Sequence, residues 1–312
     1  MKAVVTGAAG FIGSHLTESL LADGHDVIGV DAFVDYYPRE VKERNLARAL
    51  DHRSFRLVEA SLQEMDLEPV LDGASEVFHL AAQAGVRASW GQDFAVYTDN
   101  NVLATQRLLE TAVAARVPRV VYASSSSVYG DAAALPLQED TACRPVSPYG
   151  VTKLAAEHLV NLYHSNMGVP VVSLRYFTVY GPRQRPDMAF HRFLKAAREG
   201  SPIRLFGDGR QTRDFTYVDD IVAATRAAAD SGRPGGVYNV GGGERVAMTD
   251  VIARIERVTG RRLAVEREGA QKGDMRDTLA DTSAAGRDLG FHSTVTLDDG
   301  LAREWDWIRG QA

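Results

Sequence analysis

The chain contains very little cysteine, no long apolar run and no excess of positive charge. Cys143 is the single cysteine among 312 residues, which rules out an intramolecular disulfide framework and a cysteine-based metal cluster. No run of about 18 apolar residues occurs, so we expect no membrane-spanning segment. Residues 1–13 lack the basic start and unbroken apolar stretch of a signal peptide, and we therefore expect a cytoplasmic protein.

The balance of charge and apolar residues narrows the class of ligand. A formal net charge of −6 argues against a general nucleic-acid binder, which normally carries a basic surface. A few local arginines can still bind a small anion. The apolar fraction of 45% supplies a sizeable core for one large domain or two closely packed ones.

Short β-branched runs alternate with amphipathic stretches, which is typical of a parallel sheet covered by helices. We expect strands at 2–6, 26–30, 55–59, 76–80, 119–123 and 171–176, and helices at 11–22, about 100–115 and about 148–167. After Thr178 the pattern is less regular. There we expect a helix at 215–229, a strand at 236–240 that returns to the main sheet, and a helix at 249–259 with Thr249 as its N-cap.

The predicted fold is therefore α/β, with a doubly wound parallel sheet and a smaller, interleaved α/β domain. The sheet domain would comprise residues 1–177 plus about 215–241, and the smaller domain about 178–214 plus 242–312. Such an arrangement places the active site in the cleft between the two domains.

Three glycines at the first strand-to-helix turn indicate a dinucleotide site. Gly7, Gly10 and Gly13 are spaced as Gly-x-x-Gly-x-x-Gly, which lets the backbone approach a pyrophosphate at the helix N-terminus. A purely structural turn is the alternative. Asp31, at the end of the second strand, is placed to accept hydrogen bonds from ribose hydroxyls and would repel a 2′-phosphate, which favours NAD over NADP. The residues expected to contact NAD are Gly7, Gly10, Phe11, Ile12, Gly13, Asp31, Leu80, Ala81, Ala82, Tyr149 and Lys153.

The segment 147–153 carries residues suited to proton transfer. Ser147 can cap a helix in which Tyr149 and Lys153, four residues apart, share a face. The ammonium of Lys153 is expected to lower the pKa of Tyr149. Such a tyrosine removes a hydroxyl proton while a hydride leaves the same carbon. Ser125, at the end of the fifth strand, completes a Ser–Tyr–Lys catalytic set.

Together these motifs resemble the extended short-chain dehydrogenase/reductase family, in its nucleotide-sugar epimerase branch. The resemblance covers nearly the whole chain and includes the glycine loop, 79–82, 101–105, the serine strand, Tyr149 and Lys153, 175–182, 213–220 and 239–243. It implies a Rossmann-type NAD domain, a second domain that binds a UDP-sugar, and a homodimer built from the helices near 100–115 and 148–167. From the single cysteine, the negative net charge and the lack of a long apolar run, we expect no metal and no nucleic-acid or membrane partner.

The segments 31–38, 84–87 and 181–188 look most like those of UDP-glucuronate 4-epimerases. By matching positions, that resemblance assigns the sugar carboxylate to Ser126, Ser127, Thr178 and Arg185, and the diphosphate to Arg213 and Arg276. Arg87 lies in one of the matching segments and is included as a substrate contact. The alternative for Arg185 is a phosphate or surface contact.

Ser126 and Ser127 stand where related 4,6-dehydratases carry an Asp-Glu pair and related decarboxylases a glutamate. The lack of a carboxylate there favours epimerisation over elimination. The hypothesis is 4-epimerisation of UDP-glucuronate to UDP-galacturonate through a 4-keto intermediate. The alternatives are 4-epimerisation of UDP-glucose or UDP-N-acetylglucosamine, decarboxylation of UDP-glucuronate, and a non-catalytic NAD-binding regulator.

Overall fold

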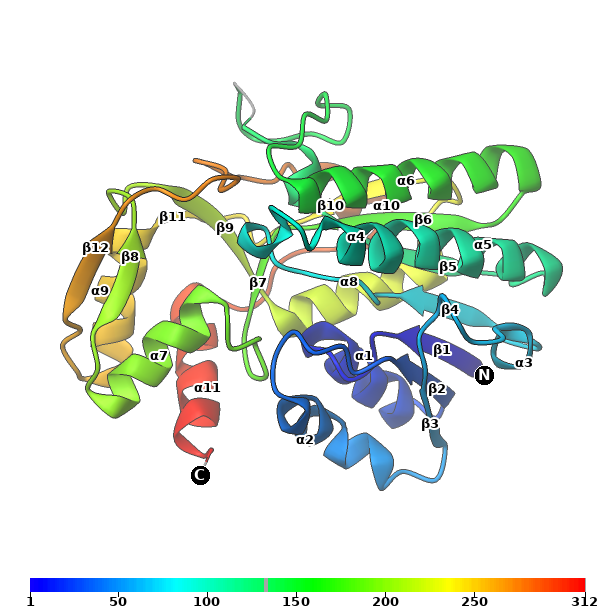
Figure 1. Cartoon of the computed structure of the whole chain (residues 1–312), viewed down its shortest axis with the longest axis horizontal. Helices are drawn as coiled ribbons and strands as arrows, with labels where there is room; N and C mark the ends of the chain where they lie inside the picture. Colours follow the sequence, from blue (N-terminus) through cyan, green and yellow to red (C-terminus); the bar gives the residue numbers. More distant parts are fainter. Residues whose placement is uncertain (132–133, 312) are drawn as a thin grey trace.

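The computed structural model describes residues 1–131 and 134–311, with a seven-stranded parallel sheet at its centre (Figure 1). The strand order is β10-β6-β5-β4-β1-β2-β3. The strands are β1 (Lys2–Thr6), β2 (Asp26–Asp31), β3 (Phe55–Glu59), β4 (Glu76–His79), β5 (Val120–Ser125), β6 (Val171–Tyr176) and β10 (Val237–Val240). The expected strands at 2–6, 55–59 and 171–176 are confirmed to the residue, and the other expected boundaries of this sheet shift by one or two residues.

Helices cover both faces of this sheet, as the doubly wound prediction requires. α1 (Phe11–Ala22), α2 (Arg39–Leu50) and α8 (Val218–Ser231) lie on one face, and α3 (Glu68–Leu71), α5 (Ala104–Ala114) and α6 (Pro148–Met167) on the other (Figure 1). Side chains alternate between the faces along β1, where Ala3 and Val5 pack with α1 and Val4 packs with α5. Since both faces are buried, the strands are apolar almost throughout.

The rest of the chain forms a smaller unit at one end of the sheet (Figure 1). Its strands are β7 (Thr178–Tyr180), β9 (Thr212–Tyr217) and β11 (Arg245–Ala247) in one sheet, and β8 (Ile203–Phe206) with β12 (Val265–Glu268) in another. Its helices are α7 (Ala189–Glu199), α9 (Met248–Thr259) and α11 (Leu297–Arg309), while α10 (Ser283–Leu289) packs beside β10. Short helical segments at Arg87–Ser89, Phe94–Tyr97 (α4), Thr98–Leu103 and Ser126–Val128 complete the fold.

Two expectations for this region are wrong. The helix expected from Phe215 begins at Val218, because Phe215–Tyr217 continue β9 and pair in parallel with Thr178–Tyr180. The aromatic and β-branched side chains there suit a pleated surface better than a helix. Thr249 is not an N-cap: α9 starts one residue earlier, after Ala247, and no side chain caps it. β10 does return to the main sheet beside β6, as expected.

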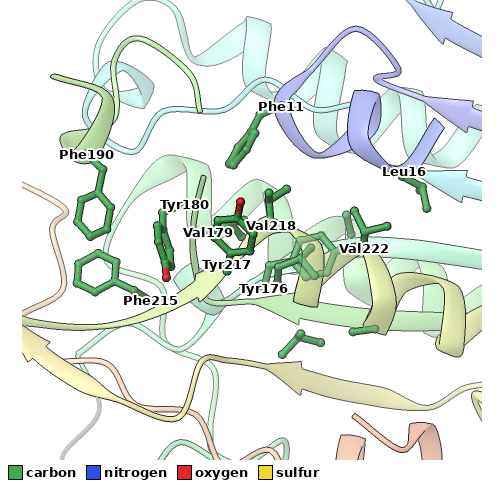
Figure 2. Packing of buried hydrophobic residues seen from close by; sticks show 14 of the residues in the cluster. Phe11, Leu16, Tyr176, Val179, Tyr180, Phe190, Phe215, Tyr217, Val218 and Val222 are labelled. Atoms are coloured by element: carbon green, nitrogen blue, oxygen red, sulfur yellow. The ribbon is translucent and has the colours of Figure 1, made fainter. Parts of the chain in front are cut away.

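An aromatic cluster fills the junction between the smaller unit and the sheet (Figure 2). The rings of Phe190 and Phe215 lie 4.5 Å apart, and Tyr180 meets Phe190 edge-on at 5.2 Å and Tyr217 at 5.5 Å. These rings connect β7, β9 and α7 in one buried core. Among the described residues, no helix has the length and apolar character needed to cross a membrane.

Candidate active site

The turn between β1 and α1 has the geometry of a phosphate cradle. The φ angle of Gly7 is +72°, which only glycine adopts without strain, and its N–H donates to the carbonyl of Val30 at 2.7 Å. A Cβ on Gly13 would lie 2.1 Å from the carbonyl oxygen of Gly7, and one on Gly7 would lie 2.9 Å from the nitrogen of Ala81. Gly10 precedes α1 with no side-chain cap, so backbone N–H groups at the helix start remain for a ligand.

Asp31 ends β2 beside this turn. Its carboxylate accepts hydrogen bonds from the N–H of Ala9 at 3.0 Å and of Phe33 at 2.9 Å, which aims the side chain along the cavity edge. Burial raises the pKa of Asp31, and the two N–H groups and Lys42 oppose that rise. Lys42 donates to the carbonyl of Val34 at 2.6 Å. Nothing in the sequence singled out Lys42, because it reads as an ordinary solvent-facing residue of α2.

The cofactor residues predicted from the sequence all line one cavity, at the carboxyl ends of the parallel strands. They are Gly7, Gly10, Phe11, Ile12, Gly13, Asp31, Leu80, Ala81, Ala82, Tyr149 and Lys153. The cavity also contains residues that sequence reasoning missed, namely Lys42, Gln63, Tyr36 and Tyr37. The residues present fit NAD, because small side chains and glycines form the cradle and a carboxylate stands at the ribose end.

Ser147 starts α6 as predicted and thereby places the catalytic candidates. Its Oγ accepts a hydrogen bond from the N–H of Gly150 at 3.1 Å, and Pro148 occupies the first helical position. Tyr149 and Lys153 then project from the first two turns into the cavity. The cap therefore fixes where the chemistry-bearing face of the helix points.

Ser125, Tyr149 and Lys153 lie at the same site, but the pKa of Tyr149 does not shift in the expected direction. Burial raises the pKa of Tyr149, and a hydrogen bond with Ser125 and the charge of Arg185 oppose the rise. The expected lowering of this pKa is not found in the protein alone, and Lys153 is not among the groups that oppose the rise. The Nζ of Lys153 donates to the carbonyl of Ala123 on β5 at 2.5 Å. Burial lowers the pKa of Lys153 itself to about 7.

Buried polar contacts hold the floor of the cavity in place. Nδ1 and Nε2 of His79 lie 2.8 Å from Oγ1 of Thr6 and 2.9 Å from Oγ1 of Thr105. Burial lowers the pKa of His79 to about 3, so the ring stays neutral and its role is structural. Asn101 donates to Oγ1 of Thr152 at 2.9 Å and so ties the helix before α5 to α6.

A second cavity of about 520 Å³ adjoins the first and opens toward the smaller unit. Of the substrate residues predicted from the sequence, it is lined by Arg87, Ser126, Ser127, Thr178, Arg185 and Arg213, together with Ser125 and Tyr149. Arg185, Tyr149 and Tyr36 line both cavities. Arg192 and Arg204 also line the second one, and the sequence carried no signal for either because both lie within ordinary amphipathic elements.

Arg276 is the predicted site residue that does not line either cavity. Its side chain is 73% exposed and its Nε lies 3.9 Å from a carboxylate oxygen of Asp277. Its backbone makes two tertiary hydrogen bonds: its N–H donates to Asp131 and its carbonyl accepts from Arg213. The assignment of Arg276 to the diphosphate stays a prediction, since its exposed side chain follows Met275, which lines the second cavity.

Arg87 reaches the second cavity with a partner already in place. Its Nη2 pairs with Asp274 at 2.6 Å, and its guanidinium lies 4.0 Å from the ring centre of Phe206.

Arg213 also lines the second cavity. Burial lowers the pKa of Arg213, and the charges of Asp274 and Asp277 partly oppose this lowering. A half-buried guanidinium that lines the cavity, as that of Arg213 does, is a strong candidate for a phosphate.

Arg185 forms a bidentate ion pair with Asp187. Its Nε donates to one carboxylate oxygen at 3.0 Å and its Nη2 to the other at 3.1 Å. Tyr36, from the loop after β2, donates to the same carboxylate at 3.2 Å.

Within the described residues, no group of three or more His, Cys, Asp or Glu side chains forms a candidate metal site.

Comparisons with known proteins agree with this arrangement. Residues 3–241 match the model of the NAD dependent epimerase/dehydratase family. A UDP-glucuronate 4-epimerase of Thermodesulfobacterium geofontis is 39% identical over 313 residues, covering 98% of this chain and 95% of that protein. An uncharacterized UDP-glucose epimerase of Bacillus subtilis, YtcB, is 45% identical over 308 residues, covering 97% and 96%. A crystal structure of UDP-glucuronic acid 4-epimerase from Bacillus cereus, in complex with UDP-glucuronic acid and NAD, superposes with a TM-score of 0.96 at 44% identity and covers 99% of each chain.

Proposed function

The chain belongs to the NAD dependent epimerase/dehydratase family, and on that premise we propose that it interconverts the C4 epimers UDP-glucuronate and UDP-galacturonate. The observation that carries the proposal is the junction of the two cavities. A dinucleotide cradle with Tyr149 and Lys153 adjoins a cavity that contains hydroxyls and the guanidinium of Arg185. The relatives named for UDP-glucuronate epimerisation support the choice of substrate.

We assign the first cavity to NAD. When bound, NAD accepts a hydride from a sugar carbon and later returns it. The glycine turn would hold the pyrophosphate through backbone N–H groups at the start of α1. Asp31 would accept hydrogen bonds from the ribose hydroxyls with the lone pairs that Ala9 and Phe33 leave free.

Tyr149 is the proposed proton carrier at the C4 hydroxyl. Ser125 favours the phenolate form of Tyr149, and both residues line the substrate cavity. Burial favours the neutral phenol in the isolated protein. The positive charge of an oxidised nicotinamide would favour the phenolate, so deprotonation of Tyr149 would be coupled to a bound cofactor. Lys153 adds a buried amine, whose Nζ donates to the carbonyl of Ala123 on β5.

The 4-keto intermediate of a uronic acid is a β-keto acid that is prone to lose CO2. Loss requires the bond between C5 and the carboxylate to stand nearly perpendicular to the carbonyl plane. We propose that Ser126, Ser127, Thr178 and Arg185 hold the carboxylate away from that orientation. All four line the same cavity, and none is a carboxylate that could act as an acid or base for elimination.

For the diphosphate, we propose Arg213 and Arg276, with Arg87, Arg192 and Arg204 as further contacts. All of these except Arg276 line the second cavity, and they come from different elements, so an acidic protein can present a local positive field to an anionic substrate. A neutral UDP-sugar is the second candidate substrate, and the name of the Bacillus subtilis relative favours UDP-glucose.

We also propose that two copies associate through α5 and α6. Val151 and Leu162 are 47% and 54% exposed, and their spacing of eleven residues puts them on one face of α6. Leu103, the last residue of the helical turn before α5, is 45% exposed, and both that turn and α5 pack against α6. Burial of such a face against a second copy would stabilise a homodimer.

The proposed function is tested by NMR of the purified protein incubated with UDP-glucuronate, without added cofactor and then with NAD. UDP-galacturonate without pentose supports both the substrate and the carboxylate contacts. A UDP-pentose would reassign the protein to decarboxylation. Turnover of UDP-glucose or UDP-N-acetylglucosamine alone would reassign the substrate, and no turnover of any of these sugars would leave an NAD-binding regulator.

A further inference from the structure

Asp187 holds one edge of the guanidinium that is proposed to bind the sugar carboxylate. The ion pair uses Nε and Nη2 of Arg185 and therefore leaves Nη1 for another partner. Burial works against the charge of Asp187, yet Arg185 keeps the pKa of this carboxyl below its ordinary value. The pair therefore stays ionised at neutral pH.

The same carboxylate is held from the opposite side of the cleft. Tyr36 donates to it, and the ring of Tyr36 faces the guanidinium of Arg185 at 5.9 Å. Tyr36 fits there because position 85 is a glycine: a Cβ on Gly85 would lie 2.2 Å from the Tyr36 hydroxyl. Tyr97 fixes this backbone with a hydrogen bond to the carbonyl of Gly85 at 2.8 Å. The loop with Gly85 therefore supports Tyr36, and Tyr36 in turn contacts Asp187 in the loop after β7.

We propose that Asp187 is a positioning residue that sets the reaction outcome: it presents the free edge of Arg185 to the substrate carboxylate in one orientation and so suppresses decarboxylation. The inference rests on the proposed function. In the side reaction, the bond between C5 and the carboxylate carbon breaks and CO2 leaves. The electron pair enters the C4 carbonyl as an enolate, a proton adds at C5, and the hydride first taken from C4 returns there. The product is a UDP-pentose and no outside oxidant is needed.

The test compares Asp187→Asn with wild type by NMR, with product ratios measured at equal conversion of UDP-glucuronate. The amide keeps the shape but can accept only one of the two guanidinium bonds, so Arg185 loses its fixed orientation. We expect UDP-pentose to reach at least about tenfold the detection limit, below which wild type stays, because small misplacements of a positioned group change rates strongly. Affinity for UDP-glucuronate should change less than about threefold, since removal of a negative charge offsets the loss of alignment. Tyr36→Phe, which removes one hydrogen bond to the carboxylate, should change the product ratio in the same direction but less.

Asp306→Asn is the matched control, because it removes a carboxylate from an exposed ion pair with Arg309 on α11. Its pentose fraction should equal that of wild type. A wild-type pentose fraction in both Asp187→Asn and Tyr36→Phe would overturn the proposal, even if either variant is less stable. Absence of epimerisation in wild type would instead overturn the proposed function, so the two failures are distinguishable.

Discussion

At the residue scale, Arg185 is the side chain on which substrate choice depends. It lies at the junction of the two cavities, whereas Ser126, Ser127 and Thr178 line only the second. A neutral sugar has no carboxylate to pair with a guanidinium at this point. Comparing a charged with a neutral UDP-sugar therefore distinguishes a carboxylate contact of Arg185 from a phosphate contact.

Arg185→Ala should weaken binding of UDP-glucuronate about ten- to hundredfold, the range expected for loss of a charged hydrogen-bonding partner. Affinity for UDP-glucose should change little, because both sugars carry the same diphosphate. A UDP-pentose by-product should also appear. The measurements are calorimetric titration with both sugars and NMR of the products, with Arg309→Ala as an exposed control. Equal losses for the two sugars would assign Arg185 to the diphosphate instead.

Lys153 makes stability depend on pH in a defined direction. Its pKa falls from the ordinary value of 10.5 to about 7 on burial. Between these values the unfolded chain binds more protons than the folded one, so the free energy of unfolding rises with pH. Relative to Lys153→Met, wild-type stability should therefore increase from about pH 7 to 10.5, by at most about 1.4 kcal/mol per pH unit.

Denaturant unfolding of the cofactor-free proteins across this pH range checks the Lys153 prediction. Lys195→Met, at an exposed position of α7, serves as control and should follow the wild-type curve. Parallel curves for Lys153→Met and wild type would show that the amine is charged in the folded state.

At the element scale, the turn from β1 into α1 is the least tolerant part of the cofactor site. Gly13 brings α1 against the backbone of Gly7, and a Cβ there has no space. The catalytic helix α6 depends on a different device, the cap by Ser147. Residues from the N-terminal turns of both elements line the same cavity.

Gly13→Ala should lower NAD affinity at least about 100-fold, or ~2.7 kcal/mol, because the helix must move away from the cradle. Overpacking should also lower the free energy of unfolding by about 1–3 kcal/mol. Gly269→Ala, where an added Cβ meets nothing within 4 Å, is the matched control and should leave both quantities unchanged. Isothermal titration with NAD, with circular dichroism to confirm folding, decides the outcome. If Gly13→Ala binds NAD with wild-type affinity, the assignment of the pyrophosphate to this turn is wrong.

At the scale of the whole molecule, the main sheet with its covering helices supplies the cofactor cradle and the proposed proton carrier. The smaller unit, including β7 and the loop that follows it, supplies Thr178, Arg185 and Arg213. The aromatic cluster at β7, β9 and α7 fixes one part against the other (Figure 2). The division into an NAD-binding domain and a nucleotide-sugar domain stays a prediction.

The double variant Val151→Lys/Leu162→Lys should convert a dimer into a monomer, because two charges would be buried on the proposed contact face of α6. Light scattering coupled to size-exclusion chromatography measures the mass directly. Val265→Lys, on the exposed strand β12, is the control and should leave the mass unchanged. A wild-type protein that already elutes as a monomer would contradict the dimer.

Local patterns in the sequence were sufficient for the parts of this protein that short segments build alone. The β1–α1 glycine turn, the capped helix α6 and the apolar strands were predicted because turn chemistry, capping and periodicity act over a few residues. The cofactor residues lie together because parallel strands end at the same edge of the sheet.

Only the tertiary structure decided the interactions between distant segments. The hydrogen bond of Tyr36 to Asp187, and the ion pair of Arg87 with Asp274, join loops that no local signal relates. The pKa values of Tyr149 and Lys153 depend on burial from all sides, so helical spacing alone predicted the wrong direction for Tyr149. The surroundings of Arg276 are also tertiary: its N–H donates to Asp131, far away in the sequence, while its side chain is exposed.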